Sequence, residues 1–169
     1  MEVTNIKTYM QSGSKVRIRM VSLMRIQNIF LSKNSNGSNR ILISKESGKQ
    51  KYKQLVSDAA WKQLNSRYQN LHCSFTKDSV LIAGYYCKKA NIQLADGKQI
   101  TAYFTNALPP ADKNIEPMFA CLPGMVLKYE YKHGNGTLIY HAVKVKHNPI
   151  SETVFREPGN EYPFKKAGD

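Results

Sequence analysis

Alternation of apolar and polar residues predicts that this chain consists mainly of β-strands. The clearest case is residues 15–20, where valine, isoleucine and methionine alternate with one lysine and two arginines. Because successive side chains of a strand point to opposite faces, this segment should have one apolar and one cationic face. Apolar residues stay dense from 16 to 31, which is longer than a typical strand. We therefore expect either a bent strand or two strands joined near Ser22.

Turn signals divide the next part of the chain into a loop and a hairpin. Residues 33–39 are rich in asparagine, serine and glycine, which favour a loop, and its basic flanks make it a candidate contact for phosphate. Strands are expected at 40–44 and 51–56, with a turn at 46–49. The sequence therefore predicts a hairpin after the loop.

Two further hairpins and a buried strand are expected in the second half. An Asp-Gly pair within 95–98 lies between alternating segments, which is a strong hairpin signal. The last hairpin should pair 125–132 with 137–146. Residues 80–87 read as one buried strand, in which Gly84 marks a bulge or a close backbone approach. The three prolines within 105–117 exclude regular sheet there.

One helix is expected between the two groups of strands. Ser57 is a suitable N-cap, and Asp58 adds an acid to the positive end of the helix dipole. Apolar residues then recur at intervals of three and four as far as Leu71, which predicts a helix over 58–71. A start nearer Tyr52 is the alternative, because the same spacing continues backwards.

The chain divides into three parts by composition. Residues 1–14 are polar and predict a flexible N-terminal arm, 15–146 predict one β domain, and 147–169 contain three prolines without periodicity and predict an irregular tail. We find no internal repeat. With 41% hydrophobic residues the chain can bury a core. The expected fold class is mostly antiparallel β, with about five to seven strands and one helix.

Positive charge is the strongest compositional feature. The chain has 25 basic and 12 acidic residues, a net charge of +13, and the tail holds four acidic against three basic residues, which leaves +14 for residues 1–146. Ten basic residues and one acid, Glu46, lie between Lys15 and Lys53. A cationic row on an ordered surface favours a polyanion such as nucleic acid. The alternative is a solvated face that only keeps the protein soluble.

Aromatic residues lie next to basic ones on the expected strands. Tyr85-Tyr86 and Tyr103-Phe104 are adjacent pairs, so one ring of each pair should face away from the core. Stacking of an unpaired base on such a ring contributes about 1 to 3 kcal/mol. The alternative is that the rings occupy ordinary half-buried positions of a sheet. The candidate nucleic-acid contacts are Arg17, Arg19, Arg25, Lys33, Arg40, Lys45, Lys49, Lys51, Tyr52, Lys53, Tyr86, Lys88, Lys89 and Tyr103.

Catalytic signals are few. Residues 1–146 contain eight acidic residues, too few for the clustered carboxylates of a metal-dependent nuclease, and nucleophile-elbow, phosphate-loop and zinc-protease motifs are lacking. We therefore expect a protein that is not an enzyme and needs no cofactor. The alternative is a small metal-independent nuclease acting through His133 and His141, which would face each other across the last hairpin.

Cysteine use and hydropathy bear on location. The three cysteines are odd in number and lie 14 and 34 residues apart, so we expect free thiols and no metal site. No apolar run reaches the roughly 18 residues that a membrane span needs, and the N-terminus lacks the apolar centre of a secretion signal. We expect a cytoplasmic protein, in the host cell interior if it is viral, without a membrane partner.

Hairpins, one interposed helix, a basic face and interleaved aromatics over residues 15–146 together resemble the OB-fold single-stranded DNA-binding proteins of phages and plasmids. The resemblance implies an antiparallel OB-like barrel and a non-catalytic protein of replication or recombination that binds single-stranded nucleic acid, with DNA favoured over RNA. It also allows a homo-oligomer or a protein partner. The chain departs from many of these proteins because it lacks a strongly acidic C-terminal tail.

Three other interpretations stay open. A double-stranded target is less expected, because the helix carries only Lys62 and Arg67. An RNA-binding subunit of a ribonucleoprotein complex would use the same surface. A viral inhibitor could instead place that surface in a nucleic-acid channel or against an acidic patch of a host protein.

Overall fold

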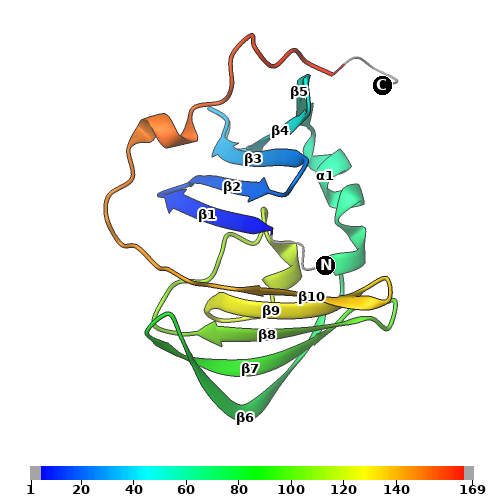
Figure 1. Cartoon of the computed structure of the whole chain (residues 1–169), viewed down its shortest axis with the longest axis vertical. Helices are drawn as coiled ribbons and strands as arrows, with labels where there is room; N and C mark the ends of the chain where they lie inside the picture. The colour runs from blue at the N-terminus through cyan, green and yellow to red at the C-terminus, as the bar shows by residue number, and fades with distance from the viewer. Residues whose placement is uncertain (1–4, 166–169) are drawn as a thin grey trace. The chain divides into compact units, whose positions relative to one another are not determined.

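The computed structural model describes residues 5–165, which form two five-stranded antiparallel sheets (Figure 1). In each sheet the strands lie side by side in the order in which they occur along the chain. The expected class, mostly β with one α-helix, is confirmed. The strands number ten among the described residues, more than the five to seven that the sequence predicts, and neither sheet closes on itself.

The chain forms two compact units, and the predicted division into arm, single β domain and tail is wrong. Residues 1–63 together with 148–169 form the first unit, and residues 64–147 form the second. The difference arises because the two ends of the chain pack on the same sheet, a long-range contact that composition along the sequence does not reveal.

The first sheet contains strands β1 to β5. Residues 6–12, predicted to belong to a flexible arm, form β1 and pair with β2 in register from Ile6 to Ser12; residues 1–4 of that arm lie outside the described residues. The expectation of two strands joined near Ser22 is confirmed, as is the hairpin that follows the 33–39 loop. The strands are β1 (Ile6–Ser12), β2 (Lys15–Val21), β3 (Arg25–Lys33), β4 (Asn39–Ser47) and β5 (Gln50–Val56).

One face of the first sheet is apolar. Strand register places the buried side chains of Val16, Ile18, Leu31, Ile41 and Val56 on this face. Each of these side chains removes apolar area from water, at about 25 cal/mol per Å². The alternation at residues 15–20 therefore assigns the apolar side chains to this face and the basic side chains to the opposite face.

The helix is shorter than predicted. The helix, α1, spans Asp58–Leu64 and is followed by the 3-10 turn η1 (Ser66–Tyr68), so it does not continue to Leu71. The Ser57 hydroxyl accepts a hydrogen bond from the backbone N–H of Ala60 at 3.1 Å, as an N-cap does. The alternative start near Tyr52 is wrong, because pairing with β4 satisfies the backbone of that segment as β5.

The second sheet contains strands β6 to β10. Residues 80–87, predicted as one strand, instead contain the β6–β7 turn, where Ala83 and Gly84 have φ of 50° and 86°. Two consecutive positive φ values fit a tight hairpin turn, which is the role of Gly84. The hairpins around 95–98 and 133–136 are confirmed. The strands are β6 (His72–Ile82), β7 (Tyr85–Gln93), β8 (Gln99–Thr105), β9 (Met125–His133) and β10 (Gly136–His141).

The segment between β8 and β9 covers one face of the second sheet. It contains the 3-10 turn η2 (Pro117–Phe119), and Phe119 and Leu122 pack with Ala90 and Ala102 of the sheet. The two alanines are fully buried. Their small side chains leave room for the ring of Phe119 directly over the strands.

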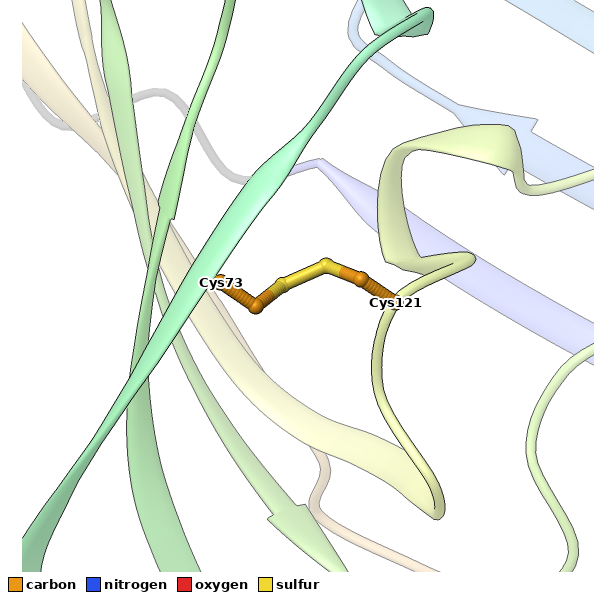
Figure 2. Close-up of a disulfide and its surroundings, with 2 residues drawn as sticks. All are labelled: Cys73 and Cys121. Carbon is orange, nitrogen blue, oxygen red and sulfur yellow. A yellow bond between two sulfur atoms is a disulfide. The ribbon is translucent and has the colours of Figure 1, made fainter.

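A disulfide joins this covering segment to the edge strand of the sheet. Figure 2 shows Cys73 of β6 bonded to Cys121. The Cα atoms of the two residues are 6.2 Å apart. The prediction of free thiols is wrong for this pair and correct for Cys87, which is free and buried. A separation of 48 residues gives no sign of the contact.

The two sheets share one hairpin geometry, although the sequence shows no repeat. In the β3–β4 turn the backbone N–H of Asn34 donates to the Ser38 carbonyl at 2.8 Å, and in the β7–β8 turn the N–H of Leu94 donates to the Lys98 carbonyl at 2.8 Å. Asn36 and Asp96 accept equivalent side-chain bonds two residues ahead. Equivalent turn positions are therefore 60 residues apart.

Gly124 permits the close approach of the covering segment to β8. A Cβ atom at this position would lie 2.6 Å from the carbonyl carbon of Thr105 and closer still to its oxygen, both of which are backbone atoms. We expect Gly124→Ala to lower the free energy of unfolding by about 3 kcal/mol or more. Urea denaturation measures this change. Gly136→Ala is the control, because a Cβ there meets nothing closer than 3.9 Å; equal losses in both variants would contradict the steric explanation.

The disulfide should contribute to stability by restricting the unfolded chain. For a separation of 48 residues, loop-closure entropy corresponds to about 4 kcal/mol. Paired substitution of both cysteines by alanine should therefore lower the unfolding free energy under oxidising conditions. With excess reductant present, the variant and the unsubstituted protein should unfold at nearly the same denaturant concentration. A difference that persists after reduction would show that the loss comes from packing and not from the covalent link.

Candidate functional site

The first sheet carries a face rich in basic residues, opposite its apolar face. Register places Arg17 beside Phe30, which pairs in turn with Leu42, and Arg19 beside Asn28. The prediction that the early basic residues share one side of the sheet is confirmed for β2, and strands β4 and β5 add to the same side. We call this side the cationic face; its basic residues are Lys15, Arg17, Arg19, Arg40, Lys51 and Lys53.

Several other predicted nucleic-acid contacts on the same sheet do not lie on the cationic face. Arg25, Lys33, Lys45 and Tyr52 project from the opposite side, and Lys49 lies in the β4–β5 turn. The Lys33 ammonium donates to the side-chain oxygen of Asn39. The ten basic residues between 15 and 53 therefore divide between two faces and a turn.

Residues 148–165, the C-terminal segment, pack on the cationic face; they are drawn from orange to red in Figure 1. The Arg17 guanidinium donates to the Asn28 side-chain oxygen at 2.9 Å and to the Val154 carbonyl at 2.9 Å, and it lies 5.1 Å from the centre of the Phe30 ring. The Lys53 ammonium donates to the Pro158 carbonyl at 3.0 Å. Backbone oxygens of the segment thus satisfy two predicted phosphate contacts.

Carboxylates satisfy two more of these basic residues. Arg40 makes a bidentate ion pair with Glu157, with both N–O distances 2.9 Å, and this hydrogen bonding raises the pKa of Arg40. Glu46 lies 3.7 Å from the Lys51 ammonium and accepts a hydrogen bond from the Tyr162 hydroxyl at 2.9 Å. Burial, followed by this bond to Glu46, raises the pKa of Tyr162.

The predicted irregular tail is therefore an integral part of the first unit. It contains the 3-10 turn η3 (Glu152–Phe155) but no long strand. Near its end the N–H of Lys53 donates to the Pro163 carbonyl at 2.9 Å, and the N–H of Lys165 donates back to Lys53 at 2.8 Å. The sequence did not identify the segment as part of the site. The signal available was its excess of acids, opposite in sign to the rest of the chain.

A cavity of about 170 Å³ lies between the cationic face and the C-terminal segment. Arg17, Arg19 and Arg156 line it, together with polar groups of the sheet that include Asn28 and Ser44. Burial lowers the pKa of Arg17, and the nearby positive charge of Arg19 lowers it further. Two guanidinium groups therefore repel each other at this cavity.

The second sheet carries a row of basic and aromatic side chains across four strands. Register aligns Lys89 of β7 with Tyr103 of β8, Tyr103 with Lys128 of β9, and Lys128 with His141 of β10. The Lys128 ammonium lies 5.2 Å from the centre of the Tyr103 ring. We call these four residues the Lys–Tyr row. Lys89 and Tyr103 were predicted contacts; Lys128 and His141 were not, although the pairing of the last two hairpins places them here.

The remaining predicted contacts, Tyr86 and Lys88, lie on the other side of β7. Tyr86 is 77% exposed, whereas Cys87 beside it is buried. Tyr103 is half-buried and Phe104 is buried. The prediction that one ring of each adjacent aromatic pair faces away from the core therefore holds for Tyr86. It is wrong for the second pair, because Tyr103 packs against the buried cluster of Ile82, Cys87 and Leu127 on one face while Phe104 is buried on the other.

The two histidines of the nuclease interpretation do not face each other. Register pairs His133 with Gly136 at the turn and His141 with Lys128 near the far end of the hairpin. The expectation was wrong because β9 extends to His133, which shifts this residue into the closing pair. Within residues 5–165, His, Cys, Asp and Glu side chains form no group of three that could hold a metal ion.

No protein family, curated protein or solved structure matches this chain. In the part of the chain that the structure describes, every helix is too short or too polar to cross a membrane.

The Arg40–Glu157 ion pair should hold the C-terminal segment on the cationic face. We expect Glu157→Gln to weaken this attachment by about 1 kcal/mol and to speed proteolytic cleavage within 148–165 several-fold. Limited proteolysis followed by mass spectrometry measures the cleavage rate. Glu152→Gln removes the same charge from an exposed position of the same segment and is the control. Equal rates for both variants would show that the ion pair contributes nothing to the attachment.

Proposed function

We propose that this protein binds single-stranded nucleic acid, with DNA favoured over RNA, and does not act on it chemically. The observation that carries the proposal is the Lys–Tyr row, in which register places Tyr103 between Lys89 and Lys128 and the Lys128 ammonium lies 5.2 Å from the centre of the ring. Neighbouring strands lie about 4.8 Å apart, so these groups follow one another at a spacing that suits contacts to a single extended strand.

Each group of the row has a defined role in this proposal. The Tyr103 ring stacks on an unpaired base, while Lys89 and Lys128 contact phosphates on either side. Stacking tolerates any base, so binding should depend little on sequence. His141 of β10 is a fourth contact at the end of the row.

The charge of each unit supports the proposal. Residues 64–147 hold ten basic and five acidic residues, a net charge of +5, and the first unit holds fifteen basic and seven acidic residues, a net charge of +8. On the cationic face, Arg17 and Lys53 are bound by neutral carbonyl oxygens, so their charges are not neutralised. Both units therefore attract a polyanion before contact is made.

A single strand is favoured over a duplex by the shape of the elements. The one α-helix that the structure describes has seven residues, which is too short to serve as a recognition helix in a major groove. A half-buried aromatic ring on a sheet stacks on unpaired bases through its accessible part, and a duplex does not offer such bases.

Titration of a labelled oligothymidine and of a duplex of equal length, at several salt concentrations, tests the proposal. We expect the single strand to bind more tightly, with an affinity that falls steeply as salt rises. Lys89→Gln and Lys128→Gln should each reduce the log–log salt slope by about 0.7. Tyr103→Leu should weaken binding about 5- to 150-fold, which corresponds to the 1 to 3 kcal/mol of one stacked base.

Lys98→Gln is the control for the lysine variants, because Lys98 is an exposed turn residue outside the row. Losses of the same size in this variant would show that only total charge matters. A shallow salt slope would favour a protein target instead. Cleavage of the oligonucleotide that survives a chelator would overturn the non-catalytic part of the proposal.

A further inference from the structure

Positively charged side chains line the cavity under the C-terminal segment, and two of them have no acceptor among the described residues. Among the residues that the structure describes, the guanidinium groups of Arg19 and Arg156 make no hydrogen bond or ion pair, although both line the cavity. The third guanidinium, that of Arg17, is fixed by Asn28 and Val154. One carboxylate, Glu46, also lines the cavity, but Lys51 and the Tyr162 hydroxyl already engage it.

An anion bound between the guanidinium groups would reduce their mutual repulsion. The neighbouring charge of Arg19 and the burial of Arg17 both disfavour the protonated form of Arg17 and lower its pKa. An anion between the guanidinium groups would reverse the first effect, and charge-assisted hydrogen bonds from arginine suit phosphate oxygens in particular. Three guanidinium groups offer more donors than a monoanion needs and match a group with two negative charges.

The cavity has room for such a group. About 10 to 15 Å³ of volume holds one water molecule, so about 170 Å³ accepts a tetrahedral oxyanion together with part of what it is attached to. Buried Asn28 and Ser44 add neutral polar groups to the lining.

The C-terminal segment restricts which phosphate can enter. The segment is bound to the sheet on both sides of the cavity, by Val154 to Arg17 and by Tyr162 to Glu46. A continuous strand would have to displace these contacts in order to lie in the cavity. A phosphate at the end of a chain can enter without displacing them.

We propose that the cavity lined by Arg17, Arg19 and Arg156 binds a phosphomonoester, supplied by the terminal phosphate of a nucleic-acid strand. The strand-end assignment rests on the proposed function, whereas the binding of the phosphate group does not. The site thereby distinguishes phosphorylated from unphosphorylated ends.

The first experiment uses inorganic phosphate as the probe, without nucleic acid. Calorimetric titration of the full chain at constant ionic strength, with chloride as the replaced anion, should show saturable binding of one phosphate. Arg19→Gln and Arg156→Gln should each weaken this binding at least tenfold. Neither side chain has a bond to lose, so both variants should unfold at the denaturant concentration of the unsubstituted protein. Arg25→Gln, on the opposite face of the sheet, is the matched control and should bind phosphate normally.

The second experiment compares oligothymidines that differ only in a 5′-phosphate, a 3′-phosphate or a hydroxyl at each end. At least one phosphorylated strand should bind about tenfold more tightly than the unphosphorylated strand, and Arg19→Gln should abolish that difference. Inorganic phosphate binding without oligonucleotide binding would remove the proposed function and the strand-end assignment, but would keep the anion site. Absence of phosphate binding, or an equal loss in Arg25→Gln, would overturn the site itself.

Discussion

One face of the first sheet is covered by the C-terminal segment, and this face carries basic side chains that need acceptors. Packing a lysine or an arginine beneath another segment costs free energy unless hydrogen bonds replace those to water. The C-terminal segment meets this requirement with the carbonyls of Val154 and Pro158 and the carboxylate of Glu157. Phe30 and Leu42 are buried on the same face. The packing of these apolar side chains and the placing of the basic ones therefore depend on one irregular segment.

Local features of this fold are readable from the sequence, and long-range ones are not. The hairpin turns are encoded by a few adjacent residues, so those at 46–49, 95–98 and 133–136 were predicted correctly. The strand β1 was missed because its alternation is weak, and the helix was extended too far because apolar spacing does not show where packing ends. Neither the contact of the C-terminal segment with β2 nor the disulfide leaves a local signal, since each joins residues far apart in the chain.

The candidate site shows the same limit. Period-two alternation assigns neighbouring residues to opposite faces within one strand, and it did so correctly for β2 and for Tyr103 and Phe104. It does not say which face of one strand continues which face of the next. Register supplies that information and separates Arg25 and Lys45 from Arg17 and Arg19, while it joins Lys89 to Lys128 through Tyr103. The proposed function therefore rests less on the basic run between Lys15 and Lys53 than on a row to which four strands each contribute one residue.

The division of the first unit between the two ends of the chain has a consequence for biosynthesis. Residues 64–147 are continuous and can acquire their fold as soon as they leave the ribosome, whereas Arg17 must wait for Val154, 137 residues later, before its guanidinium is satisfied. Until then, Phe30 and Leu42 lack the segment that covers them. The basic side chains of the first sheet therefore lack their partners from the C-terminal segment until synthesis of the chain is nearly complete.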